Sequence, residues 1–114
     1  MKFNSQICTT KEQSERLLAL GLKKGTADMH HYKWSEGYWD IQACPVRGSE
    51  PYYIPAWSLH RLLYLIPNEY FTDVDFQNVM QRCIFATSTL YDDLIDLIEA
   101  LIKEEYFYKE YLEE

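Results

Sequence analysis

An apolar stripe near the C-terminus limits most strongly what this chain can fold into. Between residues 90 and 102, leucine and isoleucine recur at spacings of three and four, at Leu90, Leu94, Leu97, Ile98, Leu101 and Ile102. Such spacing brings apolar side chains onto one side of an α-helix. The pattern therefore predicts a core-facing helix that begins near Thr89 or Tyr91, and the remaining chain must supply the surface that it covers.

A second helix is predicted near the N-terminus. Thr10 followed by Gln13 matches a capping box, in which the threonine hydroxyl and the glutamine side chain each accept a hydrogen bond from an unpaired backbone amide. Gly21 stands where a left-handed residue commonly follows a helix. Leu17 and Leu20 supply apolar contacts between these two signals.

The middle of the chain changes to residues that favour β-strands. Tyr32, Trp34 and Ile41 are typical strand residues, and the Ser-Glu-Gly segment at 35–37 suits a hairpin turn. We therefore expect paired strands within residues 30–53.

A third helix is predicted to open in the segment 54–59 and to end at Pro67, because apolar residues between them recur at helical spacing. Either Pro55 takes a first helical position or Ser58 is the N-cap. Residues 71–86 are expected to form one or two strands. The most strand-like run in that segment is Cys83, Ile84 and Phe85.

The expected order of elements is a helix, a β-rich middle, a helix, further β-structure and a closing helix. Helices gathered around a small antiparallel sheet define the α+β class. We therefore predict an α+β fold in which about three helices pack on a small antiparallel sheet. With 114 residues, the chain is expected to form a single domain over residues 1–114.

Aromatic residues are more numerous than a core of this size needs. The chain has ten tyrosines, five phenylalanines and three tryptophans, so some rings are expected at the surface, where tyrosine and tryptophan favour interfaces. The tail interleaves rings with charges and is expected to pack either on its own domain or on a second subunit. The aromatic members of the candidate interaction surface are Trp34, Trp39, Trp57, Tyr106, Tyr108 and Tyr111.

The negative charge is concentrated at the C-terminal end. From Asp92 onward, nine acidic residues accompany two lysines, which accounts for the whole formal charge of −7. The ordinary interpretation is a solvated helix face whose first acids favour the positive end of the helix dipole. The alternative is a surface for a basic partner, a mimic of nucleic-acid charge, with Asp92, Asp96 and Glu99 as its candidate residues.

No motif for catalysis, a cofactor or a metal is recognisable. His30, His31, His60 and Cys44 are conceivable zinc ligands, but adjacent residues on a strand point to opposite faces and no second paired motif exists. Basic residues are scattered, which disfavours nucleic-acid binding. The sequence therefore predicts no catalytic residues, no cofactor and no metal.

A small-ligand or enzymatic site is the main alternative to a protein-binding surface. Its expected form is an aromatic-lined pocket, since ligand sites combine apolar walls with few polar groups. The residues expected to line it are Trp57, Tyr32, Trp39 and His60.

The chain is expected to be cytoplasmic. Its N-terminus lacks the apolar region of a signal peptide, and no apolar run approaches the roughly 20 residues that a membrane span needs. Cys8, Cys44 and Cys83 stand far apart, which favours three reduced thiols that fill the core.

Several stretches together resemble a group of uncharacterised small proteins that gut anaerobes encode, often in prophages or other mobile elements. They are residues 7–14, 17–22, 26–29, 55–59, 62–63 and 91–96. The resemblance implies a bacterial or phage setting, and it transfers no activity and no functional residue.

The leading hypothesis is a small non-enzymatic protein–protein interaction or accessory protein that self-associates or binds another protein. Surplus aromatic residues without a chemical motif favour it. A small-molecule partner is the alternative, and a membrane partner is not expected.

Overall fold

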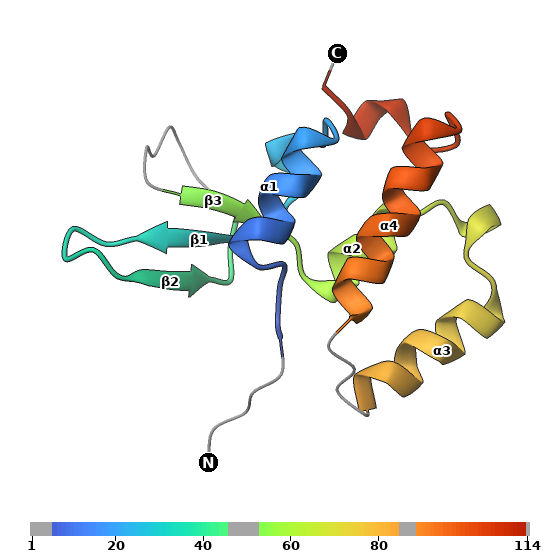
Figure 1. The fold of residues 1–114 in the computed structure, drawn as a ribbon, viewed down its shortest axis with the longest axis horizontal. Coiled ribbons are helices and arrows are strands. Elements are labelled where there is room, and N and C mark those ends of the chain that lie inside the picture. The colour runs from blue at the N-terminus through green and yellow to red at the C-terminus, as the bar shows by residue number, and fades with distance from the viewer. Residues whose placement is uncertain (1–5, 46–52, 85–88, 114) are drawn as a thin grey trace.

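The computed structural model describes residues 6–45, 53–84 and 89–113, and it has the α+β architecture expected from the sequence (Figure 1). Its sheet is antiparallel, with the order β2-β1-β3. The strands are β1 (Met29–Lys33), β2 (Trp39–Gln42) and β3 (Tyr53–Ala56). At the centre of the sheet, His31 lies opposite Ile41 of β2 and Ile54 of β3.

The predicted hairpin turn joins β1 to β2. The Trp34 amide donates to the Tyr38 carbonyl at 3.0 Å, and the Gly37 amide donates to the Trp34 carbonyl at 2.9 Å. Gly37 has φ 95°, a left-handed conformation that costs glycine no steric strain. The turn therefore forms where this glycine permits it.

Two predicted N-caps are confirmed. Helix α1 (Lys11–Ala19) begins with the complete capping box of Thr10 and Gln13. Helix α2 (Leu59–Leu65) is capped by Ser58, whose hydroxyl accepts from the Arg61 amide at 3.1 Å. Residues 54–56 were expected to open α2 but belong to β3, because Ser58 starts the helix beyond them.

The predicted closing helix is α4 (Leu90–Lys103), and its apolar side lies in the core. Ile95 and Ile98 are fully buried, and they share one cluster with Leu17 of α1, Leu62 of α2 and Trp57. The stripe therefore packs against the helices that precede it in sequence.

The strands expected within residues 71–86 are wrong. Residues 73–84 form helix α3 (Asp73–Ile84), and Phe85 and Ala86 lie outside the described residues. Thr72 and Asp75 start the helix with a reciprocal cap: the Asp75 carboxylate accepts from the Thr72 amide at 2.9 Å, and the Thr72 hydroxyl accepts from the Asp75 amide at 3.3 Å. The structure thus has four α-helices in its described parts, one more than expected.

The C-terminal tail packs on its own domain. Leu112 pairs with Leu22 in an isolated antiparallel bridge, and the Lys23 amide donates to the Tyr111 carbonyl at 2.9 Å. Phe107 is buried in the main core. No helix within residues 6–45, 53–84 and 89–113 is long and apolar enough to cross a membrane.

Candidate interaction surfaces

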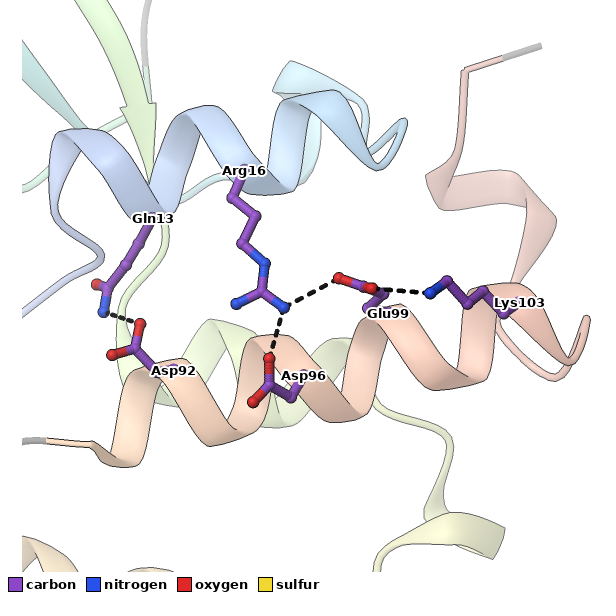
Figure 2. A network of polar contacts seen from close by, with 6 residues as sticks. All are labelled: Gln13, Arg16, Asp92, Asp96, Glu99 and Lys103. Atoms are coloured by element: carbon purple, nitrogen blue, oxygen red, sulfur yellow. Dashed lines mark hydrogen bonds and ion pairs between the residues drawn. The ribbon is translucent and has the colours of Figure 1, made fainter.

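Three acidic residues of α4, Asp92, Asp96 and Glu99, make polar contacts with α1 (Figure 2). Arg16 binds both Asp96 and Glu99, the latter at 2.9 Å, and Lys103 binds Glu99 at 3.0 Å. The bond from Arg16, followed by the bond from Lys103, lowers the pKa of the Glu99 carboxyl. The carboxylates of Asp96 and Glu99 therefore already have basic partners within the chain.

Asp92 continues this seam at the start of α4. The Gln13 side-chain amide donates to its carboxylate at 2.8 Å, as Figure 2 shows. Together with Asp96 and Glu99, it joins α4 to α1 along one side. These contacts weigh against an acidic surface that mimics nucleic acid, because two of its three candidate carboxylates are paired with Arg16 and Lys103.

Trp57 was expected in the interaction surface, and this prediction is wrong. Its side chain is 0% exposed in the core, and its indole N–H donates to the Thr26 hydroxyl at 3.0 Å. Its backbone amide donates to the Thr9 hydroxyl at 3.1 Å. Trp57 therefore holds parts of the fold together and cannot contact a partner.

The pocket expected from Trp57, Tyr32, Trp39 and His60 does not form. Trp57 is buried, His60 is exposed on α2, and Tyr32 and Trp39 lie on opposite faces of the sheet. Their opposite placement follows from the register, in which Trp39 is the partner of Lys33, the residue after Tyr32. The four residues therefore enclose no common space.

The two adjacent histidines point to opposite faces of β1, as their position on a strand predicts. His30 donates through Nδ1 to the Cys44 carbonyl at 2.7 Å, and His31 donates through Nε2 to the Thr9 carbonyl at 2.8 Å. Each ring thus joins separate segments of backbone. Within the described parts of the chain, no three His, Cys, Asp or Glu residues gather as metal ligands.

The cysteines differ in their environments. Cys8 is buried with Met29 and Ala56 in a small second cluster, as expected of a core-filling thiol. Cys44 and Cys83 are exposed, so the expectation that they fill the core is wrong. Burial, followed by the charge of Asp28, raises the pKa of the Cys8 thiol to about 11.

Trp34 and Trp39 are both exposed, and they occupy opposite faces of the hairpin. Trp34 meets Tyr32 edge to face, with 5.0 Å between ring centroids. Trp39 lies on the α1 side, where the Lys11 ammonium is 4.6 Å from its ring centroid. The hairpin therefore presents two separate aromatic surfaces.

The tail tyrosines form contacts within the chain and remain partly accessible. Tyr106 stacks on Tyr70 with a centroid distance of 5.0 Å, and Tyr108 meets Tyr111 edge to face at 5.6 Å. Tyr106 and Tyr108 are exposed, whereas Tyr111 is half-buried. These rings cover the end of the core and leave one side toward solvent.

Sequence reasoning missed an exposed apolar surface on α3. Phe76 is 50% exposed and Met80 is 46% exposed, while Val79 is the buried residue through which α3 meets the core. Arg82 binds Asp93 of α4 at 2.7 Å. The Thr72–Asp75 cap and the helical spacing of Phe76 and Met80 were the available signals.

A hollow of about 290 Å³ separates the two helices beside that ion pair. Apolar side chains that include Phe71, Val79, Leu94 and Leu97 form part of its lining, and Asp75, Asn78 and Arg82 contribute polar groups. The helices α3 and α4 therefore do not close fully on each other.

Comparison with protein-family models, curated proteins and solved structures finds no match to this chain.

Proposed function

We propose that this chain is a small non-enzymatic protein–protein interaction protein that self-associates through α3. The observation that carries the proposal is the exposure of Phe76 and Met80 on a helix that buries only Val79 among its described side chains. We call Phe76, Met80 and Cys83 the α3 stripe. Their spacing of four and three residues aligns them along the helix.

The charges of α3 favour an antiparallel second copy over a parallel one. Asp73 and Asp75 lie in its first turn, and an antiparallel pair keeps the two acidic first turns apart. The helix dipoles also oppose each other in that arrangement. A two-fold axis near Met80, the middle of the α3 stripe, makes the contact self-complementary.

The expected association is weak and reversible. Twelve residues of helix span about 18 Å. A stable interface buries about 800 Å² on each partner, and one short helix face supplies only part of that area. Dimerisation is therefore expected to depend on protein concentration.

Matched substitutions on α3 test this proposal. The double variant Phe76→Gln/Met80→Gln removes the two large apolar side chains of the α3 stripe and introduces glutamine, a good helix former. Val74→Gln is the control, because Val74 is 74% exposed on the same helix but points about 200° away from Phe76. Sedimentation velocity over a concentration series should show a dimer for the parent and for Val74→Gln. The double variant should remain a monomer.

Cross-linking tests the antiparallel orientation of the two α3 helices. Met80→Cys in a Cys44→Ser/Cys83→Ser background should form a disulfide dimer in mild oxidant, since an antiparallel pair places the two copies of residue 80 together. Phe76→Cys in the same background is the control and should react more slowly. A parent chain that is monomeric at every concentration, or equal cross-linking of both variants, contradicts the proposal.

The setting that we propose is a bacterial or phage mobile element. Its support is the resemblance in the stretches 7–14, 55–59 and 91–96. Sequencing the genes beside this one tests the setting, and neighbours with only housekeeping roles would oppose it.

A further inference from the structure

A row of aromatic rings follows one face of the sheet. His30 and Tyr32 alternate with residues that point toward α1, and Trp34 and Tyr38 extend the row to the hairpin turn. Tyr53 of β3 lies beside His30, with 6.3 Å between ring centroids. We call these five residues the aromatic track. It is separate from Trp39, which lies on the other face.

Exposure along the aromatic track increases toward the turn. His30 is buried, Tyr32 and Tyr53 are half-buried, and Trp34 is 40% exposed. At the other end, Tyr53 lines a hollow of about 100 Å³ with Pro45, Pro55 and Lys24. The aromatic track therefore runs from an open tip to an apolar hollow.

Both edges of the sheet disfavour the addition of another strand. In an antiparallel pair of strands, hydrogen-bonded and non-bonded residue pairs alternate. Because Trp34 and Tyr38 form a bonded pair, the pair of His31 and Ile41 is non-bonded, and the Ile41 amide points away from β1. The Asp40 carboxylate accepts that amide at 2.9 Å. On β3, Pro55 has no amide to donate. A partner is therefore expected on the face and not at an edge.

Charged residues lie near both ends of the aromatic track. The Lys24 ammonium is 5.9 Å from the Tyr53 ring centroid, whereas Glu36 in the turn and Asp40 beside Tyr32 are acidic. This balance does not suit a phosphodiester backbone, which needs concentrated positive charge. It suits a ligand with a basic group at one end and an acidic group at the other.

We propose that the aromatic track binds an extended proline-rich peptide in the polyproline II conformation. Neighbouring rings in the row are 5.0–6.4 Å apart, close to the roughly 6.2 Å that two residues of this helix span. Most of the ring pairs meet edge to face, so the row offers both ring faces and ring edges to pyrrolidine side chains. The phenol and indole groups are donors for the peptide carbonyls, which this conformation leaves unpaired.

The test uses an end-blocked probe peptide, Lys-Pro₈-Glu, with Lys-Gly₈-Glu and single-stranded dT₁₂ as comparison probes. All titrations are made in the Phe76→Gln/Met80→Gln background, so that self-association through α3 does not affect the result. The proline peptide should shift the amide NMR signals of β1 and of the hairpin turn, and the glycine peptide should bind at least about tenfold more weakly because it is not preorganised.

Two tryptophans provide the matched control. Trp34→Ala should weaken binding of the proline peptide by about tenfold or more, as expected of an aromatic anchor. Trp39→Ala, in the same hairpin and of similar exposure (36% against 40%), should leave it unchanged. Tyr38→Ala, at an exposed position of the turn, gives a second measurement that does not depend on the stability of the Trp34 variant.

Three results would overturn the peptide site: equal binding of the glycine peptide, equal loss in the Trp34 and Trp39 variants, or binding of dT₁₂ without the proline peptide. None of them bears on the α3 dimer. Figure 1 shows the sheet and α3 at opposite sides of the molecule, so the two surfaces do not compete.

Discussion

Helices α3 and α4 share a local design and differ in what covers their apolar side chains. Each has acidic residues in its first turn, a basic residue in its last turn and apolar residues at helical spacing. The apolar side of α4 is enclosed by α1, α2 and the tail, whereas α3 leaves Phe76 and Met80 exposed. Helical spacing thus identifies an apolar side without showing whether the same chain covers it.

The largest expected effect is a difference between α4 and α3 in how much their apolar side chains stabilise the protein. Ile98→Ala in α4 should lower the free energy of unfolding by about 2–5 kcal/mol, because it leaves a cavity at a fully buried site. Met80→Ala in α3 should change it by no more than about 0.5 kcal/mol. Urea unfolding at low protein concentration measures both values. Similar losses would show that α3 is as much a part of the core as α4.

Alkaline pH should destabilise the folded protein through two buried residues, Tyr91 and Cys8. Burial, followed by the nearby Cys8, raises the pKa of Tyr91 to about 12 from 10.0, and the pKa of Cys8 is about 11 instead of 9.0. The unfolded chain therefore releases these protons first. Their contribution to the free energy of unfolding is complete below pH 9. It is lost as pH rises toward 12, by about 2–3 kcal/mol for each group.

Urea midpoints between pH 8 and pH 12 measure this loss. Cys8→Ala should flatten the part of the curve between pH 9 and pH 11, and Cys83→Ala is the matched control on the exposed α3 stripe. Identical curves for the parent and Cys8→Ala would show that this thiol contributes nothing to the alkaline response.

The smallest expected effect concerns the end of α4. Glu105 has φ 62°, and the amides of Glu105 and Tyr106 donate to the Ile102 and Leu101 carbonyls at 3.1 and 2.8 Å. This is a helix end that favours glycine. Glu105→Gly should raise the free energy of unfolding by about 0.5–1 kcal/mol, because it relieves the left-handed strain and removes an acid from the negative end of the helix.

Glu104→Gly supplies the contrast for that change. Glu104 has φ −87°, which any residue adopts, so glycine there adds only flexibility and should lower stability by about 0.5–1 kcal/mol. Thermal unfolding of the two variants should therefore move in opposite directions. A shift in the same direction would mean that Glu105 stores no strain.

Much of the fold was predictable where local signals agree. The capping box at Thr10, the turn glycine Gly37 and the stripe of α4 each act over a few residues, and all three are confirmed. Strands were wrongly predicted in the segment 71–86 because Cys83 and Ile84 are residue types typical of a strand. Its helical start at Thr72 is a local signal of equal strength.

The candidate surface was predictable only in part, since aromatic composition shows a surplus of rings without showing which are exposed. Trp34 and Trp39 are exposed, while Trp57 fills the core beside Leu62. Asp96 and Glu99 are polar in any helix, but their pairing with Arg16 joins residues far apart in the chain. Such partners depend on how the helices pack.

Local signals in the sequence were therefore enough for the α+β class, three of the four helices and the hairpin turn, because caps, turns and apolar spacing act between neighbouring residues. The packing of distant segments determined the rest: that Arg16 of α1 pairs with Asp96 and Glu99 of α4, that Trp57 is enclosed, and that α3 and the aromatic track face outward. Burial is a property of the assembled elements, so no short stretch of sequence specifies it.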